Sequence, residues 1–405
     1  MTRNTVPGRF GRHGRMLFAS VGVLGAATLL SAAVASAATK GVAGHGTGPS
    51  ASPASLLVKP VAADTGLNAA PASPADTGRT ATPGSADTGM SAAPGSPAGT
   101  VRTVTPGSPA STATMDSRPV VPGGSVARGR YSFRTLDDAA DPTFNQLLGI
   151  NDQGRIAGYF GSGADAAHPN KGYVIYPRYR QSQFANENFP GSAQTQVVGI
   201  NNLGVTVGFF VDGGGANVGF VKRNGYFTAV TNPSTPADAP FTQLLGVNDH
   251  NVAVGFYNDA AGAAHGFTYN LYNGTFRPVH IPVAADAVTA TGINDNGDVS
   301  GFYVNGKITR GFLIRYGRFH PLSFGAGTNT QALGVNDGGR VVGSYLGASG
   351  VMHGFVWSRG TLTRVDAPHG TGGTLVNGLN NRGQIVGFYV DGAGLTHGFL
   401  GRRSS

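Results

Sequence analysis

Three sets of side chains in this 405-residue chain could do chemistry. Gln recurs at one position ahead of a Gly-Ile/Val-Asn motif, Asp recurs in Gly-rich segments, and His precedes several Gly-Phe pairs. Gln amides could hydrogen-bond a sugar or peptide, paired carboxylates could serve acid–base catalysis, and His could bind a metal. The sets are Gln146, Gln196, Gln243 and Gln331; Asp212, Asp259 and Asp391; and His265, His353 and His397.

Each set also has a structural interpretation. Gln amides can satisfy loop backbone groups. Asp beside Gly is an ordinary turn former, as in Asp212-Gly213-Gly214. The His residues belong to the third, fifth and sixth copies of a repeat, which are not all adjacent, so we interpret them as structural. We predict no metal and no cofactor, and take the Gln and Asp sets as the candidate ligand-binding residues.

The composition excludes several enzyme classes. There is no Cys, so disulfides, thiolate metal sites and thiol nucleophiles are excluded. Glu187 is the only Glu, and no Gly-x-Ser-x-Gly elbow, phosphate-binding loop or sialidase-type Asp-box is present. The enzyme alternative that stays open is a hydrolase or lyase that uses the loop Asp residues at the mouth of a central channel.

The elements that would position these side chains come from a repeat. A Gly-Ile/Val/Leu-Asn-Asp/Asn motif recurs at intervals of 42 to 50 residues, which indicates a stacked or circular array of similar units. The abundance of Gly (65) and Pro (24), with only 12% charged residues, favours all-β structure plus disordered sequence. The shared Asn residues are Asn151, Asn201, Asn248, Asn294, Asn336 and Asn380.

Each unit is predicted to contain four short strands. In the third unit these are residues 243–248, 252–257, 266–269 and 275–281. The first two are joined by an Asn-x-x-Gly turn in which Asn251 replaces the Gly in one copy, as expected for a left-handed backbone position. We interpret the six Asn and the Asp that follows four of them as turn formers and structural repeat residues. Those Asp are Asp152, Asp249, Asp295 and Asp337.

The ends of the repeat region predict a closed ring. The last unit stops after its third strand, while residues 129–136 have the form of a fourth strand and precede the first complete unit. Pairing of these two ends would remove the exposed sheet edges of an open array. We therefore predict an all-β, six-bladed β-propeller with Gly-aromatic pairs of the third strands in its core. A linear solenoid would need caps and would leave the mismatch unexplained.

A propeller has two different faces. We name the face with the Asn-x-x-Gly turns the hairpin face. The opposite face receives the longer and more variable connections, and we name it the loop-rich face. Variable loops on a rigid scaffold are where binding usually occurs. The candidate Gln and Asp residues are all predicted on the loop-rich face.

Three regions are expected along the chain. Residues 1–37 have the basic start, apolar run and Ala-Ser-Ala end of a signal peptide. Residues 38–127 are rich in Pro, Ala, Gly, Ser and Thr and are predicted to be a disordered linker. Residues 128–405 form the propeller. The formal charge of the whole chain is +9, but charges of both signs are interleaved in the propeller region. We therefore predict no nucleic-acid partner.

The repeat resembles the bacterial extracellular HAF-family repeat, named for a His-Ala-Phe triplet. The resemblance covers all six units, about residues 146–400, through Gly-Ile/Val-Asn-Asp-x-Gly followed by His-Gly-Phe. The middle Ala is Gly throughout, and Lys171, Val218 and Arg310 replace the His in three copies. The resemblance implies a secreted protein with a propeller-like fold and implies no catalytic residue.

Together these features predict a secreted, non-catalytic binding or scaffold propeller. Its loop-rich face would meet a glycan or a protein of the envelope or extracellular space. We expect a monomer in the periplasm or outside the cell, with no transmembrane segment after signal cleavage.

Overall fold

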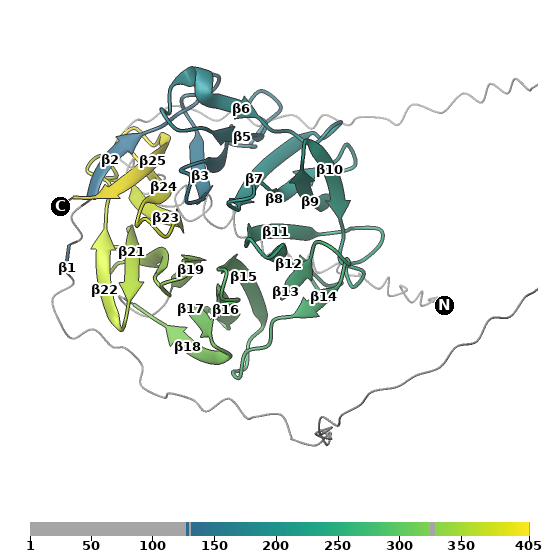
Figure 1. Cartoon of the computed structure of the whole chain (residues 1–405). Helices are drawn as coiled ribbons and strands as arrows, with labels where there is room; N and C mark the ends of the chain where they lie inside the picture. Colours follow the sequence, from purple (N-terminus) through teal and green to yellow (C-terminus); the bar gives the residue numbers. More distant parts are fainter. Residues whose placement is uncertain (1–126, 129–130, 325–328, 405) are drawn as a thin grey trace, which may run out of the picture. The chain divides into compact units, whose positions relative to one another are not determined.

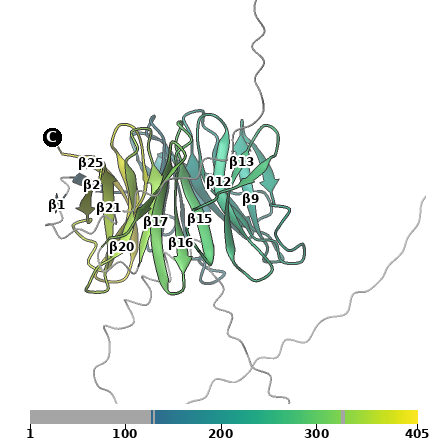
Figure 2. The same cartoon turned by 90° about the horizontal axis from the view of Figure 1, so that it is seen from below.

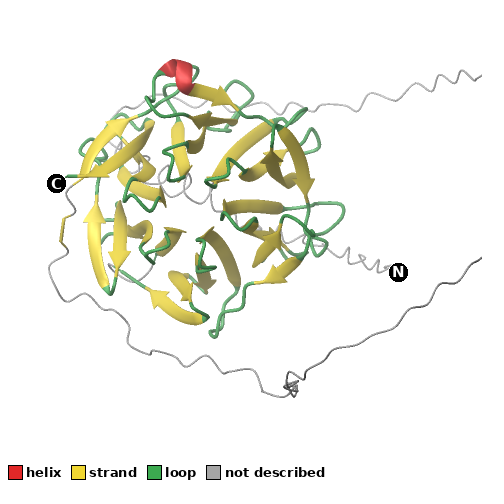
Figure 3. Cartoon of the chain, in the orientation of Figure 1, coloured by secondary structure: helices red, strands yellow, loops and turns green. Residues whose placement is uncertain are grey.

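The computed structural model describes residues 127–128, 131–324 and 329–404 (Figure 1). The predicted signal peptide lies outside these residues, as does the predicted linker except for Ala127. The described ranges consist of strands and turns, with one short 3-10 helix, η1 (Gln181–Gln183) (Figure 3). No helix among them is long and apolar enough to span a bilayer.

Six antiparallel blades surround a central axis, one for each copy of the repeat, so the prediction of a six-bladed β-propeller is confirmed (Figure 1). The strands run between the two faces of the ring (Figure 2). Blades 1 to 3 contain β3 (Asn145–Ile150), β4 (Ile156–Phe160), β5 (Lys171–Ile175), β6 (Phe184–Asn186); β7 (Gln194–Ile200), β8 (Thr206–Val211), β9 (Asn217–Arg223), β10 (Tyr226–Val230); and β11 (Thr242–Val247), β12 (Val252–Asn258), β13 (Ala264–Asn270), β14 (Phe276–Pro278). Blades 4 to 6 contain β15 (Ala287–Ile293), β16 (Val299–Asn305), β17 (Ile308–Arg315), β18 (Arg318–Leu322); β19 (Thr330–Val335), β20 (Val341–Leu346), β21 (Met352–Ser358), β22 (Thr361–Val365); and β23 (Gly373–Leu379), β24 (Ile385–Val390), β25 (Thr396–Arg403).

Blade 6 is completed from the other end of the chain. Strand β2 (Tyr131–Thr135) pairs antiparallel with β25, from Tyr131 opposite Arg403 to Thr135 opposite Phe399. The backbone N–H of Leu136 extends the pairing with a 2.9 Å bond to the carbonyl of Gly398. The predicted closure of the ring is thus present. A two-residue strand, β1 (Ala127–Arg128), adds in parallel to the outer edge of β22.

The aromatic rings of the Gly-aromatic pairs lie in the core. Each is at most 1% exposed and lies opposite the Gly of the second strand, where a side chain would collide with the ring or with the first strand. These buried rings hold the four strands of a blade together and cannot contact a ligand. They are Tyr173, Phe220, Phe267, Phe312, Phe355 and Phe399.

Every innermost strand contains a register shift that the sequence did not predict. In β3 the shift falls between Leu147 and Gly149, and the five equivalent strands shift at the same place. The extra residue lines the axial channel, and the Gly after it lies against the next innermost strand, where a Cβ would be too close. The bulge therefore brings the six strands close together around the axis.

Candidate functional site

The axis is closed on the hairpin face by the six Asn-x-x-Gly turns. In each turn the Asn Oδ1 accepts the backbone N–H four residues on, at 2.8–3.0 Å. The Gly adopts positive φ, for example +78° at Gly204, and the substituted copy does the same with Asn251 at +59°. The left-handed position inferred from that exception is therefore present.

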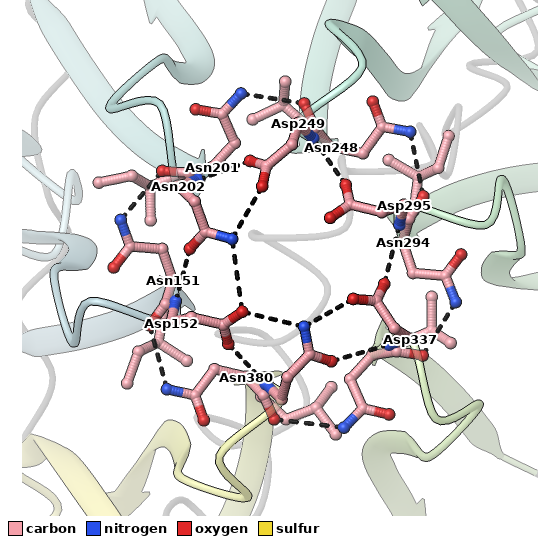
Figure 4. Close-up of a pocket in the computed structure, with 18 residues that line it drawn as sticks. Asn151, Asp152, Asn201, Asn202, Asn248, Asp249, Asn294, Asp295, Asp337 and Asn380 are labelled. Carbon is pink, nitrogen blue, oxygen red and sulfur yellow. Dashed lines mark hydrogen bonds between the residues drawn. The ribbon is translucent and has the colours of Figure 1, made fainter.

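The same Asn side chains join the blades. Each Asn Nδ2 donates to the backbone carbonyl of the equivalent Asn in the next blade, at 2.9–3.2 Å, and Asn380 returns the chain of bonds to Asn151. The side chains converge around the axis in Figure 4. All six are at most 7% exposed, so the closed ring of bonds is largely shielded from water.

A second ring lies one residue further along each turn. Asp152, Asp249, Asp295 and Asp337 share it with Asn202 and Asn381, and each Oδ1 accepts the backbone N–H of the preceding member at 2.7–3.0 Å (Figure 4). The sequence predicted turn formation for these Asp residues. Their carboxylates instead bond the neighbouring blade, because the bulged inner strands bring adjacent turns within reach.

The carboxylates of this ring differ in their neighbours. The amides of Asn202 and Asn381 bridge to Asp152, Asp249 and Asp337 at 2.7–3.4 Å. Asp295 lies between two carboxylates with no amide beside it. Burial raises the pKa of Asp295, and the charges of Asp249 and Asp337 raise it further.

The axial pocket inside these rings is small, with a volume of about 70 Å³. Its side chains are bonded to one another, and no group of three or more His, Asp or Glu residues in the described chain is arranged to hold a metal ion. We assign the rings to the stability of the closed fold.

The four candidate Gln residues lie on the innermost strands and are buried, with 0–8% exposure. The amides of Gln196 and Gln243 donate to Asn170 and Asn217 of the preceding blade, at 2.7 and 3.2 Å. The amide of Gln146 has no protein partner. A ligand role for these side chains stays a prediction.

The three candidate Asp residues lie in separate turns between the second and third strands of blades 2, 3 and 6. Each Oδ1 accepts two backbone N–H groups of its own turn, at 2.8–3.0 Å. A hydrogen bond from His265 lowers the pKa of Asp259; at Asp391 the backbone bonds outweigh the opposing effect of burial and also lower the pKa. No contact joins any two of them among the described residues.

The three His residues lie opposite a Tyr of the second strand. Their rings are 5.1–5.6 Å from those of Tyr257, Tyr345 and Tyr389. Each also contacts a carboxylate: His265 bonds Asp259 at 2.7 Å and His353 bonds Asp366 at 3.2 Å. His397 lies between Asp137 at 2.7 Å and Asp391 at 3.3 Å.

Folding distributes the charges unequally between the two faces. Turns between the first and second strands and between the third and fourth strands meet on the hairpin face, as the bond from Leu271 N–H to the Asn251 carbonyl shows. Around the acidic axial ring these turns bear Arg155, Arg178, Arg180, Arg223, Arg315, Arg318, Arg340, Arg359 and Arg382. The connections of the loop-rich face bear Asp138, Asp165, Asp212, Asp238, Asp259, Asp286, Asp366 and Asp391.

The hairpin face also bears exposed Tyr side chains that the sequence analysis did not single out. Tyr226, Tyr272 and Tyr316 are 80%, 71% and 73% exposed; Tyr272 and Tyr316 lie in turns between third and fourth strands, and Tyr226 begins β10 directly after such a turn. The signal was available in the sequence, because aligning these turns places a Tyr in three consecutive blades.

The fold thus defines the class of this protein: it is a closed six-bladed propeller. Its two faces differ in charge. No protein-family model and no curated protein matches the sequence. Solved structures with a similar fold include an inactive virginiamycin B lyase from Staphylococcus aureus with quinupristin (10% identity, TM-score 0.38, 67% of this chain and 99% of that chain). Others are TolB from Acinetobacter baumannii (9%, 0.42, 62% and 64%) and a fucose-specific lectin from Aleuria aurantia (10%, 0.37, 54% and 76%). Similarity this low assigns no activity to the chain.

Proposed function

We propose that this protein is an exported, non-catalytic binding propeller whose ligand is a glycan or a protein outside the cytoplasm. The observation that supports binding over catalysis is the placement of the loop Asp residues. Each is engaged within its own turn, and no contact joins two of them in the part of the chain that the structure describes. The export part of the proposal rests on the signal-peptide features of residues 1–37.

The proposal includes the relation to HAF-type repeats. The relation is supported by the match between the sequence repeat and the blade. Each copy of the motif builds the same hairpin and the same Gly-aromatic pair. The sequence favoured the loop-rich face for binding. The residues predicted there are buried or engaged in turns, so the proposal does not use them as ligand contacts.

A binding screen with product analysis tests this function. The full-length protein is applied to a glycan array and to envelope fractions, and any bound glycan is analysed for cleavage. We expect saturable binding with no new reducing ends and no unsaturated products. Cleavage that is lost in Asp259→Asn or Asp391→Asn would establish the hydrolase or lyase alternative instead. A blank screen would contradict the proposed function.

A further inference from the structure

A groove on the hairpin face lies beside the turns of blade 5 and reaches blade 6. It has a volume of about 510 Å³ and offers the guanidinium groups of Arg340 and Arg359 and the hydroxyl of Ser358. Asp337 also lines it, but this carboxylate already accepts the backbone N–H of Asp295 at 2.9 Å and the amide of Asn381 at 2.7 Å. The groove therefore carries two guanidinium groups against one carboxylate, and the oxygens of that carboxylate are already occupied by neutral donors.

Tyr316 lies in the third-to-fourth-strand turn of blade 4, and Arg315 links it to the hairpin turn of blade 5. The guanidinium of Arg315 is 5.0 Å from the ring centroid of Tyr316 and occupies the space that a side chain at Gly339 would need. Gly339 belongs to the same hairpin turn as Arg340. Arg315 is itself paired with Asp298 at 3.4 Å, so the cation is fixed and helps to orient the exposed Tyr ring.

The backbone at Tyr316 and Arg359 supports a role beyond the fold. Both residues are the first of a two-residue turn, followed by Gly, and both have φ of +50°. Asn224 occupies the equivalent position in blade 2 with the same φ. Asn tolerates this conformation and is the usual residue of such a turn, while Tyr and Arg are strained there. Strained residues of this kind often mark functional positions.

We propose that this groove, together with Tyr316 in the neighbouring turn of blade 4, binds an acidic polysaccharide of the polyuronate type. The inference rests on the proposed binding function and specifies its face and its ligand class. The carboxylate of one sugar would lie against Arg340 and Arg359, because guanidinium groups match carboxylates in geometry and charge. The C–H face of a neighbouring sugar would stack on Tyr316. The surrounding arginines fit the repeated negative charge of such a polymer.

Calorimetric titration of the full-length protein with polygalacturonate tests the proposal. Tyr316→Asn and Arg359→Asn place a residue that suits the turn, so we expect an unchanged or higher Tm together with at least a tenfold loss of affinity. Lys307→Gln removes one positive charge from the loop-rich face and should leave the affinity unchanged. The affinity of the wild type should fall as salt is added.

Several outcomes would overturn the inference. Equal affinity in both Asn variants would exclude the groove, and equal affinity of the wild type for neutral dextran would exclude a role for charge. Equal affinity for a single-stranded DNA, lost in the same variants, would assign the face to nucleic acid instead. Binding of only a neutral glycan or an envelope protein in the earlier screen would overturn this inference and leave the proposed function intact.

Discussion

Each axial Asn uses both ends of its amide. At Asn201 the oxygen accepts the N–H of Val205 and so holds the tight turn, and the nitrogen donates to the carbonyl of Asn248 in the next blade. Asp in this position would lose the donor, and Ser would be too short to make both bonds. One residue type thus forms the local turn and joins the blades around the ring.

Asn201→Ala should destabilise the propeller by about 3 kcal/mol, because two bonds are lost and their buried backbone partners are left without them. The measurement is the free energy of unfolding in urea. Leu203→Ala, at a 65% exposed position in the same turn, is the control and should change it by less than about 0.5 kcal/mol. Equal effects of the two substitutions would refute the assigned role of the Asn ring.

Asp295→Asn should stabilise the propeller at neutral pH by about 1 kcal/mol, because the new amide can bridge to Asp249 and Asp337 as Asn202 does to its neighbours. The raised pKa of Asp295 means that wild-type stability falls as pH rises from 3.8 through the folded-state pKa. The variant should lose this part of the pH dependence in urea unfolding. The reverse change, Asn202→Asp, should destabilise, and a neutral result for both would contradict the argument.

The closing strand β2 is held by more than its ladder to β25. Just beyond its end, Asp137 accepts the backbone N–H of Gly398 at 2.9 Å and bonds His397 at 2.7 Å. His397 also contacts Asp391 at 3.3 Å, in the turn between β24 and β25. The contact therefore joins the first strand of the propeller to the last hairpin.

The pH dependence of this contact can be predicted. The bonds and charges of Asp137 and Asp391 outweigh the opposing effect of burial and raise the pKa of His397. Its stabilising contribution is then fully present below 6.5, the ordinary value, and is lost as pH rises through the raised pKa. His397→Gln should flatten the fall in unfolding free energy that the wild type shows as pH rises above 6.5. His280→Gln, at an exposed position between blades, should keep the wild-type slope, and an unchanged slope in His397→Gln would contradict the prediction.

The sequence predicted the elements better than their contacts. The repeat spacing and the unmatched ends were sufficient for the blades and the closure, because both follow from the local pattern of turns and strands. In blade 3 the predicted fourth strand ran to Ile281, whereas β14 ends at Pro278 and the N–H of Val279 adds one further bond to the Gly266 carbonyl, at 2.9 Å. The inter-blade bonds of Asp152 and its equivalents depend on the bulges and on ring closure, which no local pattern shows.

Ring closure in the whole propeller combines strand pairing with the axial hydrogen bonds. In blade 6 the pairing of β2 with β25 makes one sheet from both ends of the chain. The axial rings and the packing between blades also cross this junction, as in the bond from Asn380 to the Asn151 carbonyl. The two contributions can be separated by moving the chain ends.

Two circular permutants would separate them. Because Tyr131 pairs with Arg403, a short Asn-Gly linker can join Ser404 to Tyr131 as a hairpin. In the first permutant, the new ends lie between Ala260 and Ala261, inside blade 3. One sheet is then still built from both ends of the chain, because β12 and β13 pair across the break. In the second permutant, new ends between Ala237 and Asp238, between blades 2 and 3, leave no sheet that is built from both ends. Packing, axial bonds such as that from Asn201 to Asn248, and the bond from Gln243 to Asn217 then join the two end blades.

We expect the first permutant to melt within a few degrees of the wild type and the second to melt lower by on the order of 10 °C, which corresponds to a loss of about 3 kcal/mol. Thermal unfolding followed by circular dichroism measures both. The expected difference arises because, in the first permutant, the two chain ends are joined by the hydrogen-bonded ladder of a single sheet. In the second permutant they are joined only by contacts between separate blades. If the two permutants melted together, packing and the bonds between blades would be sufficient to close the ring without a shared sheet.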